Sequence, residues 1–112
     1  MRREEAWLLD MLQAAREAAV FADGLDFAEF EQNRMAQLAI LKAMEIIGEA
    51  ASQVGPETKE AYPEIPWPEI IGMRNRLVHG YFNVNLKRVW ETVEQDIPRL
   101  ISQLERLAPP ES

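Results

Sequence analysis

The segment GMRNRLVHGYF, residues 72–82, gathers the side chains of this chain that are best suited to proton transfer and phosphate binding. It contains the single histidine, His79, together with Arg74, Asn75 and Tyr81. An imidazole with an unperturbed pKa of about 6.5 exchanges protons at neutral pH. A guanidinium carries a planar, permanent charge that matches a phosphate. Asn75 adds a donor and an acceptor, and Tyr81 adds a hydroxyl and a ring for stacking.

A lone histidine in a small helical protein is commonly structural or exposed, so His79 by itself does not define a site. The neighbouring Arg, Asn and Tyr side chains are not needed for a core, and most of these types are rarely fully buried. On a helix, Asn75 and His79 share a face. Arg74 and His79 are five positions apart, about 140° around the axis. For these two to converge, we expect the helix to loosen near Gly80.

The basic residues of the chain are unevenly distributed. Residues 1–71 carry 14 acids and 6 bases, and the net charge of the whole chain is −7. Residues 72–90 carry no acid and four bases, Arg74, Arg76, Lys87 and Arg88. The total charge argues against nucleic-acid binding by the whole surface, whereas the basic island predicts a local anion site. The alternative is ordinary scatter, with Arg76, Lys87 and Arg88 on a solvated face.

Length and composition favour one domain over residues 1–112, with a tail, 108–112, that frays. The apolar fraction of 47% is that of a globular protein. The chain has no cysteine, which excludes disulfides, thiolate catalysis and Cys–zinc sites. A single histidine excludes a multi-histidine metal site within one chain. We assign no metal ligand and no cofactor from the sequence.

Charged residues interrupt the apolar pattern of the N-terminal segment MRREEAWLLDMLQAAREAAV, so we expect no signal peptide. No apolar run approaches the roughly 18 residues that a membrane span needs. The absence of cysteine suits a reducing compartment. We expect a soluble, cytoplasmic protein without a membrane partner.

Apolar residues recur at three- and four-residue steps along most of the chain, which predicts helices. The first helix is expected over about residues 4–22. Asp26 and Glu29 resemble a capping box and open a second helix that continues to about Val54. Gly48, inside it, indicates a close approach of another helix, and Glu45 and Glu49 beside it are interpreted as solvated.

A proline-rich stretch follows, with a short helical turn over about residues 57–62. Trp67-Pro68 opens a third helix, because proline suits the first helical position, and Gly80 ends it. Asn85 caps a fourth helix, which Pro98 should kink or split in two. No strand pattern competes. These elements predict an all-α fold, an antiparallel four-helix bundle with a short extra helical turn.

The pattern Arg74, four residues, His79, one residue, Tyr81 resembles the signature of the HEPN superfamily, specifically its HepT-like branch. The stretch IPWPEIIGMRNRLVHGYFNVNLKRVWETVEQDIPRL resembles that branch throughout, and ILKAMEIIGEAA resembles its second helix. The resemblance covers most of the chain, in order, without a departure at the motif positions.

The resemblance implies a helical homodimer whose motifs face each other across the interface. It implies a metal-independent ribonuclease that acts as a toxin. It also implies a partner, a nucleotidyltransferase antitoxin of the MntA kind, which transfers AMP to the motif tyrosine and silences the toxin.

On this interpretation Arg74 and His79 are the catalytic residues, for phosphate charge and proton transfer respectively. Asn75 and Tyr81 position the RNA, and Tyr81 is also the AMP acceptor. Arg76, Lys87 and Arg88 guide RNA towards the site. Two alternatives remain open: a non-catalytic nucleotide-binding partner module of the transferase, and a structural helical dimer with the motif in its interface.

Overall fold

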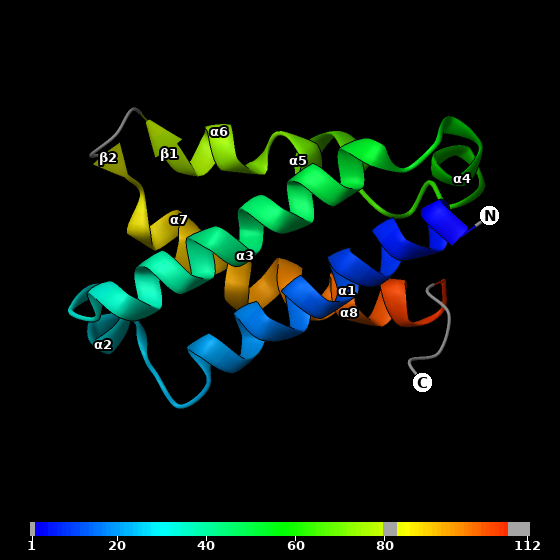
Figure 1. Cartoon of the computed structure of the whole chain (residues 1–112). Helices are drawn as coiled ribbons and strands as arrows, with labels where there is room; N and C mark the ends of the chain where they lie inside the picture. The colour runs from blue at the N-terminus through cyan, green and yellow to red at the C-terminus, as the bar shows by residue number, and fades with distance from the viewer. Residues whose placement is uncertain (1, 80–82, 108–112) are drawn as a thin grey trace.

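The computed structural model describes residues 2–79 and 83–107, and its helices form four rows that alternate in direction (Figure 1). The first row is α1 (Arg2–Ala22), and the second is α2 (Phe27–Glu31) followed by α3 (Arg34–Gln53). The other two rows are built from shorter elements: α5 (Trp67–Ile71) and α6 (Met73–Leu77), then α7 (Leu86–Glu91), the π-helix η1 (Thr92–Asp96) and α8 (Ile97–Glu105). The predicted all-α, antiparallel bundle is confirmed.

The predicted extra helical turn is α4 (Pro56–Ala61), which begins with proline in its first turn. It joins the second row to the third at the end of the bundle where α1 begins (Figure 1). Among the described residues, no helix combines the length and the apolar character that a bilayer crossing needs.

The core lies where α1 packs along α3 and α8, and where α3 packs along α5 and α6. The rings of Phe30 in α2 and Trp90 in α7 meet with centroids 5.0 Å apart, which joins the second and fourth rows. Side chains with essentially no exposed surface come from the first, second and fourth rows: Met11, Phe30, Ile40, Met44, Ile47, Val89, Ile97 and Leu104. Burial of these faces holds the bundle together.

The second helix is interrupted, so the prediction of one helix from Asp26 to about Val54 is wrong. Asp26 and Glu29 do form the predicted capping box, but α2 ends at Glu31. Asn33 is extended, and its Oδ1 accepts the Ala36 N–H at 2.9 Å to start α3 afresh. The buried Gln37 amide donates to the carbonyls of Phe30 and Glu31 at 3.0 Å. The Phe30 carbonyl also accepts the Asn33 N–H at 3.0 Å, so the Gln37 side chain adds a link between the end of α2 and the start of α3 that stabilises the break.

A short antiparallel ladder, absent from the sequence-based prediction, follows the third row. It pairs β1 (Val78–His79) with β2 (Asn83–Val84), in the register Val78 to Val84 and His79 to Asn83. The ladder forms the end of the molecule opposite α4 (Figure 1).

The predicted interruption near Pro98 takes the form of η1. The Ile97 N–H donates to the Thr92 carbonyl, five residues back, which is the π-helical spacing. Pro98 has no N–H and falls in the first turn of α8. The fourth row thus stays helical from α7 to α8, with one widened turn between them.

Gly48 occupies the close approach predicted for it. A Cβ at this position would lie 3.2 Å from the Ile70 carbonyl oxygen and 3.5 Å from that of Ile71. The backbone of α5 therefore packs directly against α3, and this contact sets the distance between the two helices.

Candidate functional site

The motif straddles the end of α6 and the hairpin that follows it. The backbone of Arg74 lies in α6, and the backbone of His79 lies in β1, opposite Asn83 in β2. Tyr81 lies outside the described residues. The hairpin, and not a helix, therefore carries the histidine.

The helix before the motif histidine ends earlier than predicted. α6 stops at Leu77, and the Asn85 N–H donates to the Leu77 carbonyl at 2.9 Å, which closes the base of the hairpin. The prediction of a helix to Gly80 is wrong, and Asn75 and His79 do not share a helical face. The expected loosening does occur, but it precedes His79, because backbone pairing with β2 replaces the last helical turn.

Two apolar residues of α6 anchor the motif to the core. Met73 and Leu77 are four positions apart and buried, at 5% and 2% exposure. Asn75 and Arg76 lie between them in the sequence and are exposed. The core therefore fixes the rotation of α6 about its axis and leaves Asn75 and Arg76 on the surface.

The second half of the basic island begins α7. Asn85 is the N-cap, as predicted, and its Oδ1 accepts the Arg88 N–H at 3.1 Å. Lys87 and Arg88 are both exposed. This cap holds the start of α7 directly after the hairpin that contains the motif histidine.

The two halves of the basic island meet at a groove between the third and fourth rows, which we call the interhelical groove. Its volume is about 590 Å³, and Arg76 and Arg88 both line it. Lys87 does not line it. The structure therefore brings together two of the three predicted RNA-guiding residues and leaves the third elsewhere on α7.

Sequence reasoning singled out only Arg76 and Arg88 among the residues of the interhelical groove, and it missed the other polar ones: Glu69, Thr92, Asp96, Arg99 and Gln103. The position of Gln103 in the sequence could have indicated its role. It falls within the apolar repeat of α8 formed by Ile97, Leu100 and Leu104, and it is buried there with them. A glutamine on the buried face of an amphipathic helix needs a polar partner.

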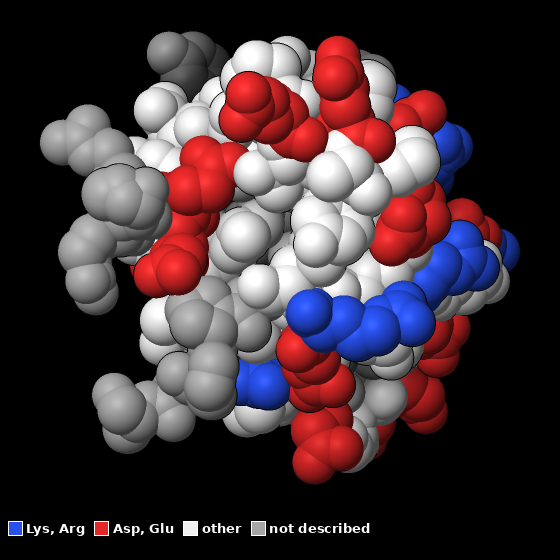
Figure 2. Space-filling model, turned by 90° about the vertical axis from the view of Figure 1, so that its right-hand side faces the viewer, with Lys and Arg blue, Asp and Glu red and all other residues white. Residues whose placement is uncertain are grey.

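Acidic side chains predominate at the opposite end of the molecule. Figure 2 faces the end with α4 and the first turn of α1, where red side chains clearly outnumber blue. Glu5 in α1 and Glu57 and Glu60 in α4 are exposed there. The end with α4 is therefore acidic, although Glu69 and Asp96 also line the interhelical groove together with Arg76 and Arg88.

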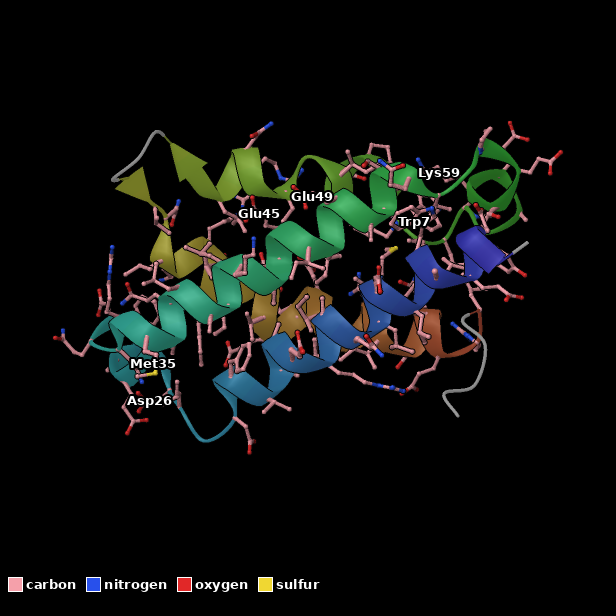
Figure 3. The ribbon with its side chains drawn as sticks, viewed as in Figure 1. Trp7, Asp26, Met35, Glu45, Glu49 and Lys59 are labelled. Atoms are coloured by element: carbon pink, nitrogen blue, oxygen red, sulfur yellow. The ribbon has the colours of Figure 1, made fainter. Side chains whose placement is uncertain are left out.

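The two glutamates beside Gly48 lie on α3, between its ends (Figure 3). Glu49 is exposed, as interpreted from the sequence, whereas Glu45 is half-buried and its Oε1 lies 3.6 Å from Lys42 Nζ. Within the described ranges, no three histidine or acidic side chains are placed to share a metal ion. The charged groups nearest the motif in the sequence are cations, which suit an anionic ligand.

The chain matches the family model "Ribonuclease HepT-like" over residues 11–107. It belongs to that family. The match includes the whole motif, the hairpin and all of the residues that line the interhelical groove. The family resemblance inferred from Arg74, His79 and Tyr81 is thereby confirmed.

Curated relatives extend over almost the full length of this HepT-like chain. "Probable ribonuclease HepT" of Thermococcus cleftensis is 37% identical over 106 residues, which cover 95% of this chain and 96% of that protein. "Putative RNase MJ1380" of Methanocaldococcus jannaschii is 36% identical over 104 residues, 93% and 95% of the two chains. "Putative RNase TTE0752" of Caldanaerobacter subterraneus subsp. tengcongensis is 34% identical over 107 residues, 96% of each. No solved structure matches the chain.

Proposed function

We propose that this protein is a metal-independent endoribonuclease and the toxin of a toxin–antitoxin pair. One observation carries the proposal: the HepT-like family match spans residues 11–107 and contains both Arg74 and His79. The names of the relatives, which designate ribonucleases, agree with it. The acidic chain with a basic island is consistent with an enzyme that holds RNA locally.

The proposed reaction uses the RNA as its own nucleophile. The 2′-oxygen attacks the adjacent phosphorus while the bond from phosphorus to the 5′-oxygen breaks, which leaves a 2′,3′-cyclic phosphate and a 5′-hydroxyl. A base takes the proton from the 2′-hydroxyl, and an acid gives one to the departing 5′-oxygen. Arg74 binds the scissile phosphate and stabilises the charge that accumulates on it in the transition state.

A homodimer supplies the second proton-transfer group. One chain has one histidine, whereas the reaction needs a base and an acid. In the proposed composite site, His79 takes the proton and His79 of the partner subunit delivers one. Asn75 orients the substrate or the imidazole, and it is exposed on α6, where it is accessible to a ligand.

Regulation is proposed to act on Tyr81. An MntA-like nucleotidyltransferase antitoxin transfers AMP to the phenolic oxygen. The adduct adds bulk and negative charge close in sequence to Arg74, and it would exclude an RNA phosphate from that guanidinium. Silencing is thus electrostatic and steric at the same site.

The first test is cleavage of total cellular RNA by the purified protein in EDTA. We expect fragments with 2′,3′-cyclic phosphate ends from the wild type and none from His79→Ala, with unchanged circular dichroism and oligomeric state. Identical purification of the variant controls for contaminating nucleases. If His79→Ala unfolds or becomes monomeric, the motif is structural.

The second test follows labelled AMP. We expect the transferase to label the wild type and not Tyr81→Phe, with Tyr62→Phe as the matched control, since Tyr62 is an exposed tyrosine that lies beside α4 and outside the motif. Equal labelling of Tyr81→Phe would place the acceptor elsewhere. If unmodified wild type cleaves no RNA but binds the transferase, the non-catalytic partner module replaces the ribonuclease.

A further inference from the structure

Gln103, which lines the interhelical groove, has a buried acceptor atom without a partner in the described ranges. Gln103 is 8% exposed, and its Nε2 donates to the Glu64 carbonyl at 3.1 Å. That bond fixes the orientation of the amide and leaves Oε1 as the free end. Among the described residues, no donor reaches this buried oxygen. Buried polar atoms are nearly always hydrogen-bonded, so a donor from outside the described chain, either a water molecule or an N–H group of a ligand, would satisfy it.

Two guanidiniums at the same groove are free to bind an anion. Arg76 comes from α6 and Arg88 from α7, and both are exposed. Within the described part of the chain, neither forms an ion pair or a side-chain hydrogen bond. With Arg99, the groove carries three guanidiniums against the carboxylates of Glu69 and Asp96, whereas the chain as a whole is negative.

Apolar side chains complete the lining. Ile70 and Met73 contribute from the third row, and Ile97 and Leu100 contribute from the fourth. The volume of about 590 Å³ lies within the range of roughly 300–1,000 Å³ that holds small organic ligands. A ligand that fits this lining has a body that packs against apolar side chains, an N–H donor and an anionic group.

We propose that the interhelical groove is a subsite for one unpaired nucleotide of the RNA substrate. Its base lies against the apolar lining and donates an N–H to Gln103 Oε1, and its phosphate binds Arg76 and Arg88. The inference rests on the proposed ribonuclease function and adds a contact outside the motif. Unpaired bases with splayed geometry are the usual target of sequence-selective RNA recognition.

Continuity with the motif favours RNA over a protein segment as the occupant. Met73 and Arg76 line the groove, and Arg74 and Asn75 lie between them on the same helix. At about 1.5 Å of rise per residue, these positions span less than one helical turn. The backbone of Arg74 is therefore less than one helical turn along the axis from the residues that line the groove, a separation that a neighbouring nucleotide of a strand passing around α6 can span.

The test measures binding without cleavage. The probe is a fluorescein-labelled single-stranded RNA of about ten nucleotides, within the usual site sizes, with 2′-O-methyl groups that prevent attack by the 2′-oxygen. Anisotropy titrations at several salt concentrations compare Arg88→Ala and Gln103→Met with matched controls. Arg106→Ala removes an exposed arginine that does not line the groove, and Gln95→Met replaces an exposed glutamine of η1 that does not line it.

The two groove variants should weaken RNA binding with different dependences on salt. Arg88→Ala should weaken binding and reduce the slope of log K against log salt by about 0.7, the value for one phosphate contact on a single strand. Gln103→Met should weaken binding roughly threefold to tenfold with an unchanged slope, because it removes an uncharged hydrogen bond. Arg106→Ala and Gln95→Met should match the wild type. If Gln103→Met unfolds at a clearly lower temperature than the wild type, Arg76→Ala replaces it in the comparison. Arg76 is exposed, and its variant should give the same result as Arg88→Ala.

The outcomes separate this inference from the proposed function. Groove variants that bind RNA like their controls overturn the subsite, even if His79-dependent cleavage is established, and a protein segment then becomes the occupant to consider. Weakened binding in the groove variants supports the subsite, even if the wild type cleaves nothing and the ribonuclease proposal fails. A wild type that does not bind the probe overturns both.

Discussion

The α1–α3 hairpin and the motif segment, residues 73–88, are built in opposite ways. α1 and α3 have 21 and 20 residues, and they pack against each other along most of their length. The motif segment consists of a five-residue helix, a ladder with two residues in each strand, and the start of a six-residue helix. Long helices bury enough surface to hold themselves in place, whereas the motif segment depends on a few anchors and caps.

The residues that stabilise the fold and those proposed to act in catalysis therefore lie in different parts of the chain. The buried residues of α3 carry no group suited to catalysis, and the exposed residues of the motif segment contribute little to the core. Mutations in the two regions should therefore affect different measurements, and the following changes test that separation in order of decreasing effect.

The largest loss of stability is expected from Ile47→Ala in α3. Ile47 is fully buried, and truncation leaves a cavity that costs about 2–5 kcal/mol of unfolding free energy. Urea denaturation measures the loss. Leu38→Ala in the same helix is the control, because Leu38 is 52% exposed and should change stability by less than about 0.5 kcal/mol. Equal losses would show that α3 is not the stabilising element.

Arg74→Lys is expected to lower kcat/KM for RNA cleavage by about 100-fold without a change in unfolding free energy. Lysine keeps the charge but lacks the planar pair of donors that matches a phosphate in the transition state. Arg34→Lys, at the exposed start of α3, is the control and should leave cleavage unchanged. Full activity of Arg74→Lys would reduce the role of Arg74 to a point charge.

Two asparagine caps offer a direct comparison of the regions. Asn33 starts α3 and Asn85 starts α7, and each accepts a backbone N–H through Oδ1. Replacement by alanine should cost about 1 kcal/mol in either case. Only Asn85→Ala should also reduce cleavage, because Asn85 follows the hairpin that carries His79. Equal effects of the two variants on specific activity would contradict this separation.

The smallest effect is expected from Glu105→Gln. Its Oε2 lies 3.0 Å from Arg16 Nη2, and both side chains are nearly half exposed. Such surface pairs contribute about 0–1 kcal/mol and are screened by salt. Thermal melting should show a small decrease at low salt that disappears at high salt.

The rows of the bundle were predictable because each depends on local periodicity. Gly48 was also informative, since a glycine inside a helix indicates a close neighbour, and α5 is that neighbour. The break before Asn33 was missed because the helical pattern continues through it. What decides the break is a pair of side-chain contacts, the Asn33 cap and the Gln37 amide, that compete with the helix.

The sequence identified which residues form the motif, but it did not predict how they are arranged in space. Spacing alone placed His79 on a helix, whereas pairing of β1 with β2 ends the helix at Leu77. The meeting of Arg76 with Arg88 depends on how α6 packs against α7, which no local pattern encodes. The burial of Gln103 likewise becomes meaningful only when the carbonyl of Glu64 is seen to bind its amide.

The widened turn of η1 takes up one residue without changing the phase between the two halves of the fourth row. A π-turn holds one residue more than an α-turn over nearly the same rotation about the axis. Removing the exposed Gln95 should therefore leave a helix of ordinary pitch in which Leu100, Gln103 and Leu104 keep their positions relative to Val89 and Trp90. The stretch between Trp90 and Leu100 is thus a place where the chain can lose one residue without turning the buried face of α8 away from the core.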